Sequence, residues 1–219
     1  MSKLVWDASG ERLFETGVDR GVLFPMTNGT YGTGVAWNGL TAVNDTPSGG
    51  EPTKLYADNI AYITLMSVEE LGLTIEAFTY PDEFEECDGY KELSAGVVVG
   101  QQTRKHFGFS YRTLIGNDEE STDHGYKIHL VYDCVASPSE KSHSTVNDSP
   151  EAEQLSWDVA TTPVAIPLEG AKPSAEIIID STEVDETKLK AIEALLYGTE
   201  QDESTMPSPA KLLEILTKP

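Results

Sequence analysis

The chain has 219 residues, of which 39% are hydrophobic, and its 37 acidic and 15 basic side chains give a formal net charge of −22 at pH 7. This length is enough to bury a core. The charge argues against a DNA- or RNA-binding protein, which needs Lys and Arg to displace counterions from phosphate, and it disfavours anionic membrane surfaces. No run reaches the roughly 18 apolar residues of a membrane span, and the N-terminal residues lack the apolar core of a signal peptide.

The first half of the chain reads as short strands joined by polar turns. Residues 17–25 have an apolar end that leads into TNGTYGTG, where Asn-Gly and the following glycines signal a turn. Residues 34–43 are rich in strand formers, and the polar stretch 44–54 is predicted to be a long loop. Residues 55–67 read as one or two strands. Residues 74–79 alternate with period two, which is typical of a half-buried strand.

The middle of the chain continues in the same way. Residues 93–102 and 105–116 read as strands, and residues 155–166 as one more. Residues 126–136 alternate between two faces, a pattern typical of an antiparallel sheet. Antiparallel β-structure is therefore expected to dominate the fold.

The C-terminal part changes to a helical pattern. Asp185 or Ser181 is a candidate N-cap, and Leu189, Ile192, Leu195 and Leu196 recur at helical spacing before Gly198. We therefore predict a mainly β fold of two packed antiparallel sheets, sandwich-like or barrel-like, with a flanking C-terminal helix. One domain spans residues 1–219, with an N-terminal arm over 1–16 and a C-terminal extension over 199–219.

Motifs for catalysis are missing from the sequence. There is no Gly-x-Ser-x-Gly elbow, no phosphate-binding Gly-x-x-x-x-Gly-Lys, no His-Glu-x-x-His and no Cys-x-x-Cys. The four histidines are scattered, and His129, on a strand beside Lys127, is expected to be solvated or interfacial. Cys87 and Cys134 could form one bridge, but buried or free thiols are favoured because nothing indicates an oxidising compartment. We predict no enzymatic activity, no metal and no cofactor.

The stretch YPDEFEECDGY, residues 80–90, concentrates carboxylates around one cysteine. Its acidic residues do not follow the spacing of an EF-hand, although an opportunistic cation site stays open. Phe84, between the carboxylates, is expected to pin the loop to the core together with Tyr80. Nearby negative charge raises a thiol pKa, which favours a packed Cys87 over a nucleophile. The stretch is therefore interpreted as an acidic loop.

Several ordered blocks resemble the major tail proteins of long-tailed bacteriophages. They include GVAWNGLTAVNDTPSGGEPTKLYADNIAY, EAFTYPDEFEECDGY, KHFGFSYRTLIGND, GYKIHLVYDCVASPSEKSHSTVNDSPEA and KLKAIEALLYGTE. With KPSAEIIID and MPSPAKLLEIL, the resemblance covers roughly Trp6 to Leu216. It implies two packed antiparallel sheets with a flanking helix, and a structural role instead of catalysis.

The resemblance also implies partners and a location. Such proteins form hexameric rings that stack into a hollow tail tube, through which DNA passes without specific binding. The expected partners are further copies of the chain and the tape measure, tail terminator and distal tail proteins. The expected location is the virion, after synthesis in the bacterial host cytoplasm. An acidic lumen would repel DNA and let it slide.

Two sets of residues are candidates for this role. The ring-to-ring contact is assigned to the loop from Asn44 to Asp58, through Asn44, Asp45, Thr46, Glu51, Lys54, Tyr56 and Asp58. The lumen or the outer surface is assigned to Asp82, Glu83, Glu85, Glu86, Asp88, Asp118, Glu119 and Glu120. The N-terminal arm, residues 2–16, the C-terminal segment, residues 206–216, and exposed strand edges are further candidates for contacts between copies.

Three alternatives stay open at the level of sequence. A β-sandwich binding module for carbohydrate or a cell-surface partner would group exposed aromatic residues such as Trp6, Trp37 and Trp157 on one face. A metal-dependent hydrolase would use the acidic stretch 80–90. The inner tube of a contractile tail is related in fold, but the sequence blocks favour the non-contractile tail.

Overall fold

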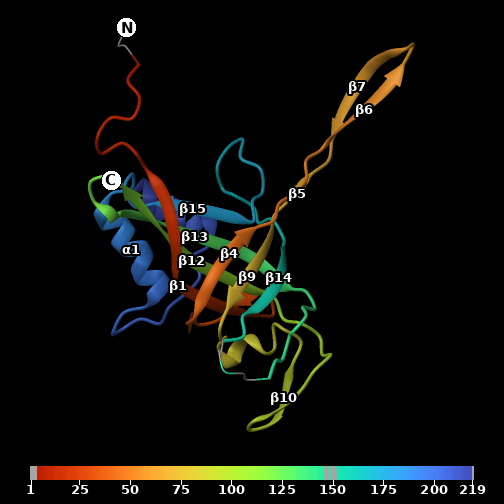
Figure 1. Ribbon diagram of the computed structural model, residues 1–219, viewed down its shortest axis with the longest axis vertical. Coiled ribbons are helices and arrows are strands. Elements are labelled where there is room, and N and C mark those ends of the chain that lie inside the picture. The colour runs from red at the N-terminus through yellow and green to blue at the C-terminus, as the bar shows by residue number, and fades with distance from the viewer. Residues whose placement is uncertain (1–3, 146–147, 149–151, 219) are drawn as a thin grey trace.

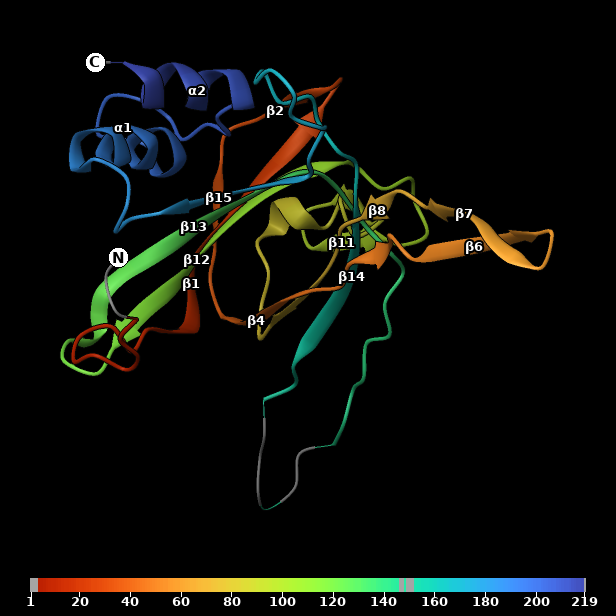
Figure 2. The same ribbon diagram turned by 90° about the horizontal axis from the view of Figure 1, so that it is seen from above.

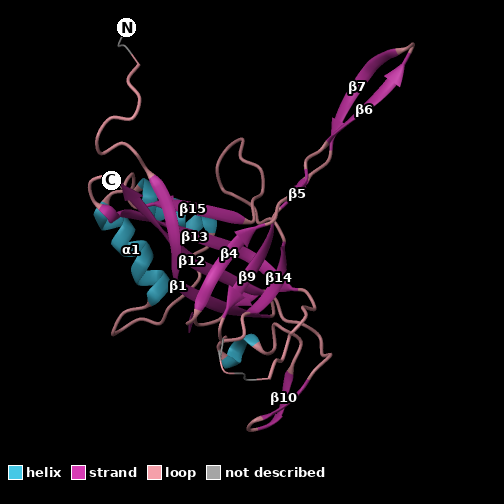
Figure 3. Cartoon of the chain, in the orientation of Figure 1, coloured by secondary structure: helices cyan, strands magenta, loops and turns pink. Residues whose placement is uncertain are grey.

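A large antiparallel sheet dominates the computed structural model, which describes residues 4–145, 148 and 152–218 (Figures 1 and 3). Its strands are β1 (Phe14–Thr27), β2 (Thr30–Tyr31), β3 (Val35–Trp37), β4 (Leu40–Asp45), β9 (Gly72–Ala77), β12 (Phe107–Asn117), β13 (Ser121–Ala136), β14 (Leu155–Thr161) and β15 (Glu176–Asp180). They are ordered β2-β1-β12-β13-β14-β9-β4, with β3 also beside β1 and β15 also beside β13. The mainly β prediction is confirmed.

The sheet curls until its two ends meet. β3 pairs with β1, near one end of the strand order. β4 follows β3 after Asn38 and Gly39, and it pairs with β9 at the other end of the strand order. Gly21 of β1 permits this approach, because a Cβ atom there would lie 2.4 Å from Leu40 Cδ1. The halves β1–β12–β13 and β4–β9–β14 therefore face each other, as predicted for a sandwich or barrel, but they belong to one continuous sheet.

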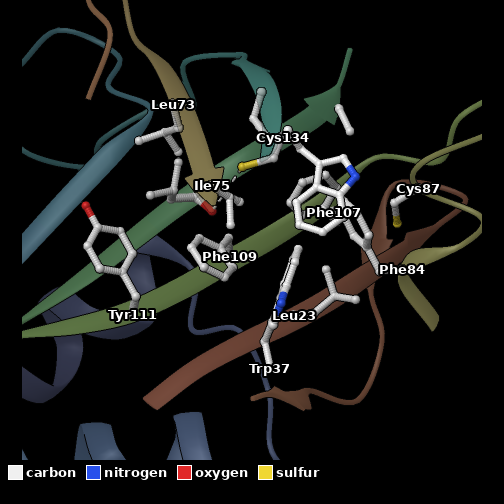
Figure 4. Packing of buried hydrophobic residues seen from close by; sticks show 14 of the residues in the cluster. Leu23, Trp37, Leu73, Ile75, Phe84, Cys87, Phe107, Phe109, Tyr111 and Cys134 are labelled. Atoms are coloured by element: carbon white, nitrogen blue, oxygen red, sulfur yellow. Dashed lines mark hydrogen bonds between the residues drawn. The ribbon is translucent and has the colours of Figure 1, made fainter. Parts of the chain in front are cut away.

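An aromatic cluster fills the space between the two halves (Figure 4). The ring of Phe84 lies 4.5 Å from Trp37, 5.3 Å from Trp157 and 5.6 Å from Phe107, measured between centroids. These are edge-on or tilted geometries, which aromatic pairs prefer. The alternation predicted for β13 is confirmed as well, because its two faces contribute to two separate cores.

Two helices cover the other face of the sheet (Figure 2). α1 (Glu186–Tyr197) begins after Asp185, whose carboxylate accepts from the backbone N–H groups of Thr187 and Lys188, and ends at Gly198, whose φ is 74°. This confirms one of the two predicted caps and the predicted stop. α2 (Pro209–Thr217) follows. Its Leu212 is buried in the cluster that α1 forms with β13, so the C-terminal segment finds a partner surface within its own subunit.

The remaining strands form pairs that project from this body. β5 (Ser48–Gly49) pairs with β8 (Glu69–Glu70), β6 (Pro52–Ala57) with β7 (Ile60–Met66), and β10 (Lys91–Ser94) with β11 (Val97–Val99). The 3-10 helix η1 (Asp82–Phe84) precedes β10. The prediction of a loop over residues 44–54 is wrong at both ends, because β4 runs to Asp45 and β6 begins at Pro52. Residues 93–102, expected to form a single strand, instead contain the end of β10, a turn and the whole of β11.

Candidate functional site

A long hairpin arm, residues 46–71, projects from the body between β4 and β9 (Figure 1). Its root is the short pair β5–β8, and its outer part is the pair β6–β7, which runs from Pro52–Met66 to Ala57–Ile60 with a register shift between Leu55 and Tyr56. Asp58 and Asn59 form the two-residue turn at its tip, with φ values of 51° and 62°. Positive φ at both central positions is typical of a type I′ hairpin turn, which Asp and Asn tolerate.

The outer part of the arm is apolar and uncovered. All of its residues from Pro52 to Met66 are exposed, and Tyr56, Tyr62 and Met66 have exposed fractions of 71%, 72% and 72%. An isolated two-stranded hairpin is marginally stable in water, and contiguous apolar surface of this kind marks interaction sites. The arm therefore has the properties of a segment that packs against another molecule.

The candidate contact residues between Asn44 and Asp58 do not form one loop. Asn44 and Asp45 belong to β4, opposite Thr74 and Leu73 of β9, so they lie in the body. The other candidates extend along the first limb of the arm to its tip, in the order Thr46, Glu51, Lys54, Tyr56 and Asp58. The returning limb, β7, is not among the candidate contact residues predicted from the sequence, although the β-branched and aromatic residues within 60–65 are a strand signal.

The acidic stretch is fixed to the core in the way its sequence predicts. Phe84 is fully buried in the aromatic cluster, and the ring of Tyr80 lies 6.0 Å from it. Asp82, Glu83 and Glu86 are exposed around this anchor. With Glu85 and Glu92 they line an open, acidic cavity of about 550 Å³ beside the β10–β11 hairpin.

Asp88 departs from its predicted role as a lumen or surface carboxylate. Its side chain is 4% exposed and faces two cations, with Lys141 Nζ at 2.6 Å and Arg104 Nη2 at 3.8 Å. The ammonium of Lys141 also lies over the rings of Tyr80 and Tyr90, at 5.4 and 4.7 Å from their centroids. A carboxylate without neighbouring charge would not tolerate such burial. Asp88 therefore belongs to an internal ion cluster.

The second acidic stretch, the turn between β12 and β13, holds the N-terminal segment. Ser9 Oγ donates to Glu119 at 2.7 Å, and the backbone N–H of Gly10 donates to Asp118 at 3.0 Å. Glu120 lies 2.6 Å from the imidazole of His124. These three predicted surface carboxylates are exposed, as expected, but each has a contact within the subunit. Of the predicted N-terminal arm, residues 1–3 lie outside the described residues, and Leu4, Val5 and Trp6 are exposed.

His129 contradicts the prediction of a solvated or interfacial side chain. It is 6% exposed, stacks on Tyr111 with ring centroids 4.5 Å apart, and places Nδ1 2.9 Å from Glu176. Its Nε2 lies 3.2 Å from Thr113 Oγ1, which resembles a hydroxyl–imidazole–carboxylate triad. However, the Thr113 hydroxyl donates its proton to Glu15 at 2.6 Å, so it has none to give to the imidazole. We assign this cluster a structural role.

Both cysteines are buried free thiols, as the sequence favoured. Burial, more than the neighbouring carboxylates, raises the pKa of Cys87 to about 12. Burial also raises the pKa of Cys134 well above its ordinary value. Thiolates are the nucleophilic form, so neither sulfur is activated.

Within the described residues, no group of three or more His, Cys, Asp or Glu side chains could hold a metal ion. Over the same residues, no helix is long and apolar enough to cross a membrane. No protein-family model matches the chain, and no curated protein matches it either.

Proposed function

We propose that this chain is a virion structural protein that polymerises, as stacked hexameric rings, into the tail tube of a long, non-contractile-tailed bacteriophage. The resemblance of the sequence blocks to major tail proteins supports the family assignment and the six subunits per ring. The observation that carries the assembly role is the arm, residues 46–71, whose exposed apolar outer part requires a partner surface. In the tube, the arm of one subunit packs against the neighbouring ring.

Strand edges supply the contacts within a ring. β15 pairs with β13 along one side, and no strand of the described part of the chain pairs with its other edge. Ile178 on this strand is 51% exposed. An exposed edge can accept a strand from another copy, which extends the sheet from subunit to subunit.

The net charge suits a conduit for DNA. A polyanionic genome is repelled by carboxylates, and screening over about 8 Å at physiological salt keeps that repulsion short-ranged. The same charge opposes assembly, because each copy carries −22. Low salt is therefore expected to hinder polymerisation of the pure protein, and added salt or divalent cations to favour it.

Negative-stain electron microscopy of the purified protein across a salt series tests the proposal. Hollow tubes or rings of uniform diameter are expected, with longer tubes at higher salt. A variant in which a short Gly-Ser linker replaces residues 51–68 is the matched control, because these side chains lie outside both cores. It is expected to fold but not to form tubes. A wild-type protein that stays monomeric throughout the series, or tubes that grow faster as salt is withdrawn, would contradict the proposal.

The binding-module alternative receives no comparable support. It required exposed aromatic residues on one face, with Trp6, Trp37 and Trp157 as the candidates, but Trp37 and Trp157 lie in the core at 3% and 0% exposure. Trp6, in the N-terminal segment, is exposed. The acidic stretch likewise supplies no ligand set for the hydrolase alternative among the described residues.

A further inference from the structure

A second open cavity, of about 400 Å³, lies at the foot of the β10–β11 hairpin. Its lining includes Asp88, Tyr90, Gln102, Arg104, Ser139 and Lys141. The cavity therefore brings together three segments distant in sequence, and we call it the Arg104–Lys141 pocket. It does not overlap the acidic cavity formed by η1 and β10.

The charge of this pocket is opposite to that of the chain. Arg104 and Lys141 share one buried carboxylate, Asp88, which leaves one positive charge in a protein of net charge −22. The hydrogen bonds described for this structure use none of the guanidinium donors of Arg104, and its Nε is shielded from solvent without an acceptor. A guanidinium presents several donors in a fork that matches a carboxylate. The pocket is therefore suited to bind a second carboxylate.

The arm carries a carboxylate in the complementary position. Asp58 is the single acidic residue between Pro52 and Met66, and it stands in the turn at the tip. In Figure 1 the tip lies at one end of the long axis, and the hairpin that contains β10 lies at the other end. The arm therefore points away from the pocket of its own subunit. When subunits stack head to tail, the tip of one faces the pocket end of the next.

We infer that the Asp58 carboxylate of one copy binds in the Arg104–Lys141 pocket of the next copy. The inference rests on the proposed ring stacking and identifies the surface that the tip of the arm contacts. The apolar strands of the arm supply contact area, and the ion pair fixes how far the arm inserts. Asp88 Oδ1 lies 3.8 Å from Arg104 Nη2, which is too far for a hydrogen bond. A second carboxylate in this pocket would accept hydrogen bonds from these unused donors of Arg104.

Asp58→Asn removes the charge with little change in shape, because asparagine also tolerates a positive φ. Glu200→Gln, at an exposed position after α1 and outside the arm, makes the same charge change away from the proposed contact and is the control. We expect Asp58→Asn to raise the protein concentration needed for tube formation about tenfold, and Glu200→Gln to change it less than about twofold. The defect should shrink at 1 M salt, where the Debye length is about 3 Å.

Cross-linking tests the same contact by position. Ala57→Cys, beside the tip, and Gln102→Cys, at the pocket, should give disulfide-linked ladders in assembled tubes, whereas either substitution alone should not. The native Cys87 and Cys134 do not compete, because both are fully buried. Asp58→Asn tubes that form at the wild-type concentration, or double-cysteine tubes without ladders, overturn the inference and leave the proposed function standing. A wild-type protein that never associates overturns both.

Discussion

Replacing Phe84 by alanine tests whether the acidic stretch is held by its aromatic anchor. Phe84 is fully buried and contacts Trp37, Trp157 and Phe107. Removing a buried Phe side chain lowers the free energy of unfolding by about 3–5 kcal/mol. Its several aromatic contacts place this site toward the upper part of that range. For a chain of this size, a loss of about 4 kcal/mol lowers the melting temperature by roughly 8–16 °C.

Two assays follow this change. Urea unfolding monitored by tryptophan fluorescence reports the free energy, because Trp37 and Trp157 belong to the same cluster. Thiol labelling under native conditions reports whether the acidic stretch stays attached to the core. Cys87 is buried beside Phe84, so it is expected to become reactive only in the variant. Phe78→Ala is the control, since that ring is 54% exposed. Equal losses for Phe84→Ala and Phe78→Ala, or unchanged Cys87 labelling, would refute the anchoring role.

Other predictions concern the arm and the pH dependence of stability. Gly49→Ala should weaken the root of the arm, because φ is +79° there and a Cβ would lie 2.2 Å from the carbonyl oxygen of Val68. Its melting temperature should stay within about 2 °C of wild type while assembly weakens several-fold, and Gly96→Ala, equally left-handed but in open space, should leave assembly unchanged. Burial acts to raise the pKa of Glu15, but hydrogen bonds from Lys127 and Thr113 outweigh it and lower the pKa from 4.5. The stability contributed by this carboxylate is therefore present above that value and lost as the pH falls below it. Between pH 6 and 3, the free energy of unfolding measured with urea should fall less steeply with decreasing pH in Glu15→Gln than in the wild type. Parallel curves for the two proteins would contradict this.

Local patterns in the sequence determined most of the secondary structure. Alternation in β13 and helical spacing with an Asp185 cap depend on neighbours within a few residues, so they could be recognised directly. The anchoring role of Phe84 was also predictable, because a large apolar residue among carboxylates has few places to go except the core. The charge of −22 indicated the kind of surface, but not which residues form it.

The tertiary structure decided everything that depends on contacts distant in sequence. In the sequence, Asp88 cannot be distinguished from the exposed carboxylates of the same acidic stretch. It is an internal ion because Arg104 and Lys141 converge on it from two other segments. His129 is buried because the strands on either side of β13 place Tyr111 of β12 and Glu176 of β15 beside it. The arm reads locally as a polar loop followed by one or two strands, and only the pairing of β6 with β7 makes it a projecting hairpin. Burial and ion pairing depend on which segments meet, and the short-range pattern of a sequence does not specify that.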